Sequence, residues 1–206
     1  MRALGTMQKL GPGQPIFHEG DPVRRVFMLA NGSLKIYTLL ADGRRQITGF
    51  MFPGDFLGVS IDDEYAFTAE ALVQSELWWF TRDVFDRFVE DNPKVERELY
   101  RLAAHELAAA QSQMVLLGRK TAAERLASFF LSLLERQEMV VGERQSEFDL
   151  PMNRLDIADY LGLTKETVSR MLAHLRSRKL IRLASQDRIE ILDRAGLKEM
   201  AEGFGD

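Results

Sequence analysis

The chain of 206 residues contains no cysteine. This absence excludes disulfide bonds, cysteine-based zinc sites, iron–sulfur clusters held by thiolates and thiol redox switching. Histidine is scarce as well. The three histidines, His18, His105 and His174, stand far apart, without the close spacing that places metal ligands on one element. The sequence therefore predicts no bound metal and no cofactor.

Long apolar runs and enzyme motifs are also missing. No stretch approaches the roughly 18 apolar residues of a membrane span, and the start, MRALGTMQKLGPG, lacks the apolar core of a signal peptide. We therefore expect a cytoplasmic protein with no membrane partner. There is no cysteine nucleophile, no G-x-S-x-G motif and no glycine loop that cradles phosphate, so we expect that the protein is not an enzyme.

The charge is unevenly distributed, although the formal net charge is −4. Within residues 164–182 the only acid is Glu166, and the basic side chains are Lys165, Arg170, Arg176, Arg178, Lys179 and Arg182. Electrostatic attraction to phosphate acts over about 10 Å at ordinary salt. A local basic patch can therefore attract nucleic acid even on an acidic chain.

Residues 154–175, RLDIADYLGLTKETVSRMLAHL, read as two helices joined by a sharp turn. Gly162 tolerates the positive φ with which many helices end, and Thr164 can cap the second helix. The apolar face of the first helix is predicted to comprise Leu155, Ile157, Ala158 and Leu161. That of the second is predicted to comprise Val168, Met171, Leu172 and Leu175.

The opposite face of the second helix carries Glu166, Ser169, Arg170 and Ala173. Arginine can bond the O6 and N7 atoms of guanine together, glutamate can accept from the amino group of cytosine, and serine can bond either kind of base edge. This trio in a predicted helix-turn-helix favours sequence-specific DNA binding. The alternative is an ordinary helical hairpin with a solvated charged face.

Glycines punctuate the first part of the chain and separate short β-rich runs. The predicted strands are residues 15–18, 26–29, 34–40, 46–52, 67–73 and 76–80. Asp42-Gly43 is a strong hairpin signal. Many short strands at regular spacing indicate a small jelly roll or barrel.

Two helices are predicted next, over residues 81–91 and 94–117. In the longer one, apolar or small residues recur every three or four positions, as in the seam of a two-helix coiled coil. They are Tyr100, Ala103, Leu107, Ala110, Met114 and Leu117. We therefore expect a homodimer, the alternative being a helix that packs only on its own β-domain.

A second domain is expected to follow Gly118-Arg119-Lys120-Thr121. Thr121 can cap a helix that runs to about residue 137. Residues 147–152 suit a short strand, residues 179–193 a β-hairpin wing and residues 193–201 a last helix. Together with the central motif, these elements predict a winged helix-turn-helix.

The segments TKETVSRMLAHLRSRKLI and LLGRKTAAERLASFFL resemble the CRP/FNR family of bacterial transcription regulators, and its FixK-type branch in particular. The order FHEGD, NGSLKIYTLLADGRRQI and FPGDFLG is similar to the cyclic-nucleotide-binding-type β-roll of that family. The resemblance implies an α+β protein: a β-roll over residues 1–93, a dimerisation helix over 94–118 and a winged helix-turn-helix domain over 119–206.

The same resemblance implies that Glu166, Ser169 and Arg170 read a TTGA-type half-site, which a palindromic operator presents twice. Candidates for phosphate contact are Arg154, Thr164, Lys165, Thr167, Arg176 and Lys179. A transcription activator of this kind also needs RNA polymerase as a partner. Exposed candidates for that contact are residues 41–45 and 62–64, and FixK-type proteins serve low-oxygen gene control.

Family members that bind cyclic AMP hold its phosphate with an arginine and backbone N–H groups. Here residues 46–81 contain no lysine or arginine but six acids, Asp55, Asp62, Asp63, Glu64, Glu70 and Glu76. A phosphodiester would be repelled there and would lack a cation. We therefore predict a regulator without a small-molecule effector. The alternative is an effector-gated sensor, for a gas at a haem or for a nucleotide.

Overall fold

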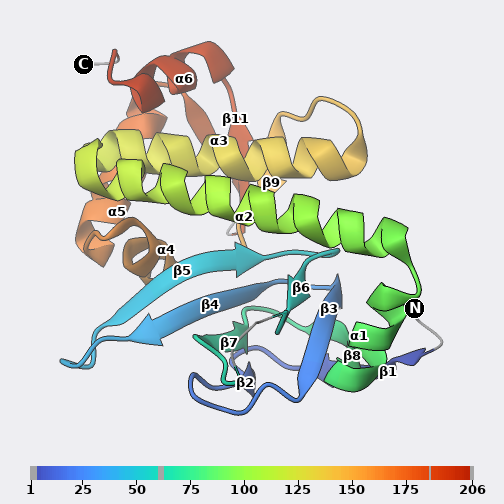
Figure 1. The fold of residues 1–206 in the computed structure, drawn as a ribbon. Helices are drawn as coiled ribbons and strands as arrows, with labels where there is room; N and C mark the ends of the chain where they lie inside the picture. The colour runs from blue at the N-terminus through green and yellow to red at the C-terminus, as the bar shows by residue number, and fades with distance from the viewer. Residues whose placement is uncertain (1–3, 60–62, 186, 205–206) are drawn as a thin grey trace. The chain divides into compact units, whose positions relative to one another are not determined.

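The computed structural model describes residues 4–59, 63–185 and 187–204. The chain divides into two compact units, Met1–Ala109 and Ala110–Asp206. Helix α2 (Pro93–Arg119), the longest in Figure 1, contributes residues to both. Each unit has its own core, and each is described separately.

The N-terminal unit is built from two antiparallel four-stranded sheets. Their strands are β1 (Thr6–Leu10), β2 (Pro15–Phe17), β3 (Arg25–Asn31), β4 (Leu34–Leu39), β5 (Arg45–Met51), β6 (Phe56–Leu57), β7 (Thr68–Ala71) and β8 (Ser75–Thr81). The sheet orders are β1-β8-β3-β6 and β2-β7-β4-β5. This confirms the predicted β-roll, and every strand predicted from the sequence is present with ends shifted by a residue or two.

Apolar side chains that alternate along these strands fill the space between the sheets. Leu29, Leu34 and Leu77 are almost inaccessible to solvent. Phe17 stacks on Tyr65 with ring centroids 3.7 Å apart. The sequence did not indicate β1 or β6, because β1 is a largely exposed edge strand and β6 has only two residues.

The predicted hairpin at Asp42-Gly43 joins β4 to β5. Gly43 has φ 83°, and the N–H of Leu40 donates to the carbonyl of Arg44 at 2.8 Å. The backbone N–H of Arg44, followed by its guanidinium, holds the pKa of the exposed Asp42 carboxyl below its usual value. The turn is thus fixed by local bonds.

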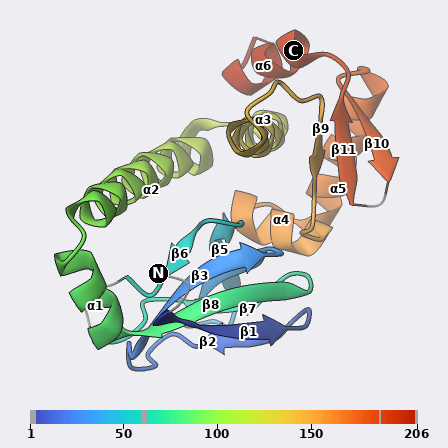
Figure 2. The same ribbon diagram turned by 90° about the vertical axis from the view of Figure 1, so that its right-hand side faces the viewer.

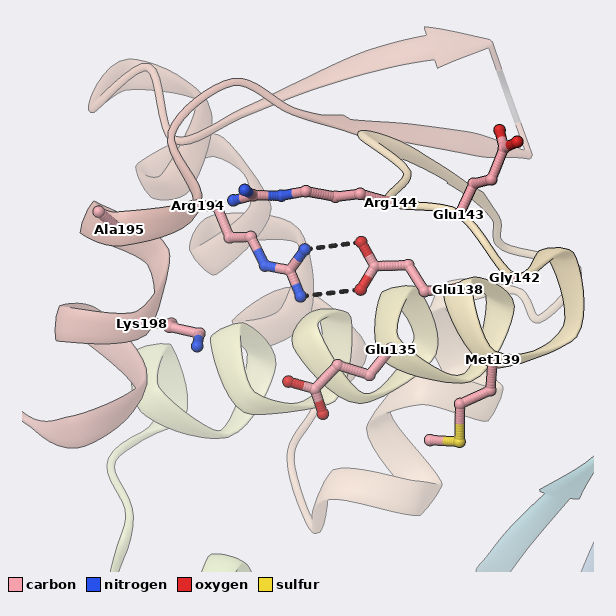
Figure 3. Close-up of a pocket in the computed structure, with 9 residues that line it drawn as sticks. All are labelled: Glu135, Glu138, Met139, Gly142, Glu143, Arg144, Arg194, Ala195 and Lys198. Atoms are coloured by element: carbon pink, nitrogen blue, oxygen red, sulfur yellow. Dashed lines mark hydrogen bonds and ion pairs between the residues drawn. The ribbon is translucent and has the colours of Figure 1, made fainter.

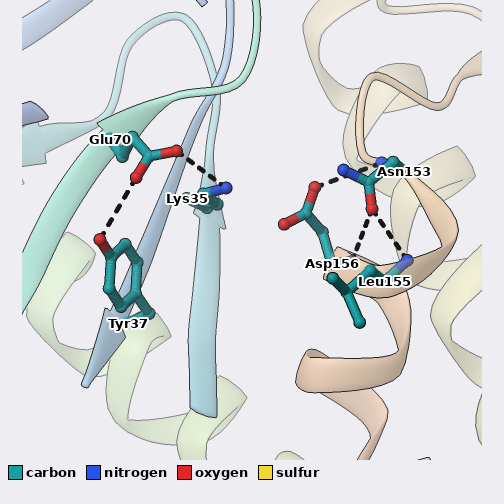
Figure 4. A network of polar contacts seen from close by, with 6 residues as sticks. All are labelled: Lys35, Tyr37, Glu70, Asn153, Leu155 and Asp156. Carbon is teal, nitrogen blue, oxygen red and sulfur yellow. Dashed lines mark hydrogen bonds and ion pairs between the residues drawn. The ribbon is translucent and has the colours of Figure 1, made fainter. Parts of the chain in front are cut away.

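Cations from elsewhere in the unit neutralise part of the acidic segment. Lys35 on β4 lies 2.9 Å from the Glu70 carboxylate on β7, and Tyr37 donates its phenolic O–H to the same carboxylate at 3.2 Å (Figure 4). Lys9 pairs with Glu76 at 2.9 Å. The count of acids along residues 46–81 therefore overstated the local negative charge, because sheet pairing supplies bases that lie far away in sequence.

The helices that follow the β-roll agree with the sequence. Helix α1 (Arg82–Glu90) buries Phe85. In α2 most of the predicted seam faces solvent: Tyr100, Leu107 and Met114 are 71%, 63% and 72% exposed, and Ala103 and Ala110 are exposed as well. Leu117 is half-buried. Helix α2 continues through Gly118 and ends at Arg119, two residues beyond the predicted end.

The C-terminal unit is a winged helix-turn-helix. Its elements are α3 (Ala122–Val141), β9 (Glu147–Asp149), α4 (Arg154–Leu161), α5 (Lys165–Ser177), β10 (Ile181–Ser185), β11 (Arg188–Ile191) and α6 (Arg194–Glu202). The three strands form an antiparallel sheet in the order β10-β11-β9, as Figure 2 shows. Helix α3 begins at the predicted cap, Thr121, and extends past residue 137 to Gly142, which has φ 78°.

Candidate nucleic-acid interface

Helix α4 opens with a cap that the sequence analysis overlooked. The Asn153 side chain accepts the backbone N–H groups of Leu155 and Asp156 at 2.8 and 3.0 Å (Figure 4). The carboxylate of Asp156, only 1% exposed, accepts the Asn153 N–H in return, at 3.4 Å. Such a capping box satisfies backbone donors that a helix start otherwise leaves unpaired.

The prediction was wrong for one residue of the apolar face of α4. Ile157, Ala158 and Leu161 are buried as predicted, but Leu155 is 49% exposed. Leu155 lies in the first turn, where the buried Asp156 takes the inward position because its carboxylate completes the cap. The polar requirement of the helix start therefore overrides the apolar periodicity.

The turn between α4 and α5 has the predicted geometry. Gly162 ends α4 with φ 61°, the left-handed conformation that favours glycine. A Cβ atom at this position would lie 3.4 Å from the side chains of Arg125 and Leu117, an ordinary van der Waals contact, so glycine is favoured here by the backbone conformation rather than by lack of space. The Thr164 hydroxyl then caps α5 by accepting the backbone N–H of Thr167 at 3.1 Å.

Helix α5 separates a buried face from a solvent face as expected. Val168, Leu172 and Leu175 are buried, and Met171 is half-buried. Glu166 and Arg170 are exposed on the other side, and Ser169 is half-buried. The predicted base-reading side chains thus lie on the accessible face of the helix.

Hydrogen bonds organise this accessible face. Ser169 donates its hydroxyl proton to the carbonyl of Lys165 at 2.9 Å and accepts from Nη1 of Arg154, on α4, at 3.2 Å. The Thr164 and Thr167 hydroxyls are 3.0 Å apart. The structure therefore joins one predicted phosphate-contacting residue, Arg154, to one predicted base-reading residue, Ser169.

Arg176 lies in the last turn of α5, and Lys179 follows the cap residue Arg178; both side chains are exposed. Lys179 has φ 56° and is the only residue other than glycine with positive φ in the part of the chain that the structure describes. Its N–H donates to the carbonyl of Arg176 at 2.9 Å, and the N–H of the buried Leu180 donates to the carbonyl of Leu175 at 3.1 Å. These bonds hold a lysine in a conformation that normally favours glycine.

The wing changes the predicted charge of this surface. Arg182 on β10 forms an ion pair with Glu190 on β11, with Nε 2.6 Å from the carboxylate. Glu190 therefore partly neutralises Arg182, one of the six basic side chains counted over residues 164–182. The tip of the wing includes residue 186, which lies outside the described residues.

A cavity of about 600 Å³ opens between α4, α5 and the wing. Arg154 and Lys165 line it together with apolar side chains, among them Leu155 and Leu183. The exposed Leu155 therefore borders a hollow beside the basic face of α5.

A second hollow, of about 830 Å³, lies between the end of α3 and α6 (Figure 3). There the Arg194 guanidinium donates to both carboxylate oxygens of Glu138, at 2.6 and 2.9 Å. These bonds, followed by one from the backbone N–H of Gln145, hold the pKa of Glu138 below its usual value. The pair connects α6 to α3.

The histidines and carboxylates of the described residues are not gathered into a metal-binding cluster. The described residues contain no group of three or more histidine, cysteine, aspartate or glutamate residues that could hold a metal ion. His18, His105 and His174 are all exposed. None of the helices in the described ranges is long and apolar enough to cross a membrane.

Each of the two units contains a segment that matches a known domain family. Residues 7–92 match the cyclic nucleotide-binding domain family, and residues 124–200 match the Crp-like helix-turn-helix domain family. The nitrogen fixation regulation protein FixK of Bradyrhizobium diazoefficiens is 39% identical over 198 residues, which cover 96% of this chain and 83% of that protein. The transcriptional activatory protein AadR of Rhodopseudomonas palustris is 40% identical and is covered over 79% of its length, with 92% of this chain.

The chain is also similar to a solved structure of a FixK-type protein. FixK2 from Bradyrhizobium japonicum superimposes with a TM-score of 0.87 at 34% identity, covering 95% of this chain and 96% of that one. The similarity therefore spans the β-roll, the long helix and the winged helix-turn-helix. By its sequence and its fold, the chain belongs to the CRP/FNR family of bacterial DNA-binding transcription regulators, in the FixK-type branch.

Proposed function

We propose that the protein is a cytoplasmic transcription activator that binds a palindromic, TTGA-type operator as a homodimer. The observation that carries this proposal is the exposed face of α5, where Glu166 and Arg170 reach solvent beside Ser169. In the proposed complex Arg170 bonds guanine, Glu166 accepts from cytosine on the opposite strand, and Ser169 bonds a neighbouring base.

Phosphate contacts position this reading face along the duplex. The proposed contacts come from Arg154, Thr164, Lys165, Thr167, Arg176 and Lys179. Five of these side chains are exposed and Thr167 is half-buried. Such contacts carry no sequence information but make the affinity fall as salt is added.

Dimerisation is proposed along α2. Tyr100, Leu107 and Met114 leave three large apolar side chains in solvent on one helix, an arrangement that a second copy of the helix would cover. We expect Leu107→Glu and Met114→Glu each to give monomers in light scattering and to abolish operator binding. A matched change on the same helix, Glu98→Gln, should leave the dimer intact. Intact dimers in both apolar variants would contradict the seam.

We further propose that the protein acts without a small-molecule effector, in low-oxygen-linked gene control. The support is chemical: the acidic segment 46–81 contributes no lysine or arginine for a cyclic nucleotide phosphate, and the three histidines are exposed rather than enclosed as haem ligands. RNA polymerase is the proposed partner in activation. Residues 41–45 and 63–64 are candidate contacts, whereas Asp62 of the same loop lies outside the described residues.

A gel shift with the purified protein and no additive tests this proposal directly. Tight binding to a TTGA-type palindrome, and weak binding to a scrambled duplex at the same salt concentration, supports an effector-independent regulator. Affinity that appears only after a nucleotide or haem is added would support the effector-gated alternative instead.

A further inference from the structure

The hydrogen bonds of Ser169 limit what this side chain can recognise. A serine hydroxyl has one proton to donate and two lone pairs that accept. The proton is committed to the Lys165 carbonyl at 2.9 Å, and one lone pair accepts Nη1 of Arg154 at 3.2 Å. What remains is one lone pair. In this arrangement the hydroxyl is available to DNA as an acceptor only.

An acceptor matches some base edges and not others. In the major groove adenine and cytosine present amino groups, which donate, whereas guanine and thymine present carbonyl oxygens, which accept. A free serine could rotate its hydroxyl to suit either kind. The Lys165 carbonyl holds the proton on its own side. The bond from Arg154 removes one further rotation, because a hydroxyl that accepts from a guanidinium cannot point its proton toward it.

We propose that Arg154 is a positioning residue for sequence readout: together with the Lys165 carbonyl, it fixes Ser169 as an acceptor, so that the protein selects a base with an amino group at the position Ser169 reads. A guanidinium has five N–H donors, and the bond to Ser169 needs only one. The same side chain can therefore still donate to a backbone phosphate. This inference rests on the proposed function of α5 and assigns Arg154 a role beyond phosphate contact.

The test compares binding ratios across a panel of operators rather than single affinities. Ser169→Ala first identifies the base pair whose discrimination depends on the hydroxyl. At that pair, the adenine or cytosine is then replaced by purine or 2-pyrimidinone, which lack the amino group. We expect the wild-type protein to lose about threefold to tenfold in affinity for the analogue, the range of one ordinary hydrogen bond, and Ser169→Ala to lose little.

Arg154→Ala is expected to reduce the ratio of affinities for the natural base and the analogue by about threefold or more. In the Ser169→Ala background, the Arg154→Ala change should have no further effect on that ratio. The control is Arg176→Ala, an exposed arginine on α5 that should weaken all operators equally. Arg154→Met keeps the aliphatic stem and replaces the alanine variant if circular dichroism shows that the latter is unfolded.

Three results would overturn the proposal. One is Arg154→Ala weakening every operator by the same factor, as a pure phosphate contact does. Another is an additive effect of the double variant on the ratio. The third is full affinity of the wild-type protein for the analogue that lacks the amino group. If Ser169→Ala and Arg170→Ala both leave all affinity ratios unchanged, the proposed base reading by α5 fails as well. That outcome differs from the three above, which overturn only the role of Arg154.

Discussion

Lys179 combines an unfavourable backbone conformation with a proposed role in DNA binding, and the two can be separated by one substitution. A side chain at φ 56° brings its Cβ atom close to the backbone, which costs roughly 1–2 kcal/mol for residues other than glycine. Strain of this kind persists where the surroundings impose it. Here backbone bonds to the last turn of α5 and the buried Leu180 do so.

Lys179→Gly should therefore stabilise the C-terminal unit. Relief of roughly 1–2 kcal/mol is offset by about 0.5–1 kcal/mol, because glycine gains freedom in the unfolded chain. The midpoints of these two ranges leave a net gain of about 0.75 kcal/mol. For a domain of this size, 1 kcal/mol shifts Tm by about 4–8 °C, so the melting temperature should rise by roughly 3–6 °C.

The same substitution should weaken DNA binding. One lost phosphate contact lowers the slope of log K against log salt by about 0.9, and a homodimer that loses two contacts should show a fall of roughly 1.8. The assays are thermal melting by circular dichroism and fluorescence anisotropy with a labelled operator at several salt concentrations. Lys179→Arg, which keeps both the charge and the strained backbone, is the matched control and should change neither quantity.

Lys179→Gly is thus expected to raise the stability of the C-terminal unit and to lower its affinity for DNA. A lower melting temperature for Lys179→Gly would mean that the lysine stem contributes packing that outweighs the strain. A higher melting temperature with an unchanged salt slope would remove Lys179 from the phosphate contacts and leave the conformation without a functional reason.

Three further predictions concern the reading face and its supports. Arg170→Ala should cost roughly 1–3 kcal/mol in operator binding and relax the preference at one base pair, and a binding-site selection with unchanged preference would refute its role. Gly162→Ala should destabilise the unit by roughly 1 kcal/mol or more, measured by denaturant unfolding, because a Cβ atom is disfavoured at φ 61°. The lowered pKa of Glu138 means that its pair with Arg194 contributes stability above the usual glutamate pKa of 4.5 and loses it as the pH falls through the lower folded-state value. Glu138→Gln should therefore flatten the acid limb of a stability–pH curve, and an unaltered limb would contradict the pair.

The sequence predicted the parts of the fold that depend on local periodicity and turn chemistry. The buried stripe of α5, the caps at Thr121 and Thr164 and the glycine turn at Gly162 all follow from residues within about one helical turn of one another. Such signals are readable because neighbours in sequence are then neighbours in space.

Contacts between residues far apart in sequence were not predictable in this way. Arg154 and Ser169 are 15 residues apart and come from different helices. Lys35 reaches Glu70 only because β4 and β7 pair in one register, and Arg182 reaches Glu190 across the wing. A count of charges along the chain therefore predicted which charged residues each surface carries, but not which of them form ion pairs.

Arg125 shows how one such long-range contact gives the helix-turn-helix a fixed support. Its guanidinium donates to the carbonyls of Lys120, Leu161 and Leu117 at 2.9, 2.8 and 2.9 Å, which are acceptors at the ends of α2 and α4. Helix ends leave such carbonyls without partners, so one arginine satisfies both ends at once.

The amide of Gln113 adds a fourth bond of this kind, from α2 to the carbonyl of Tyr160 on α4, at 2.9 Å. The last turns of α2 are therefore bonded directly to the turn that orients α5. In a homodimer paired along α2, this connection would fix the distance between the two reading helices. Half-site spacing would then follow from the carbonyl contacts of Arg125 and Gln113 as much as from the seam itself.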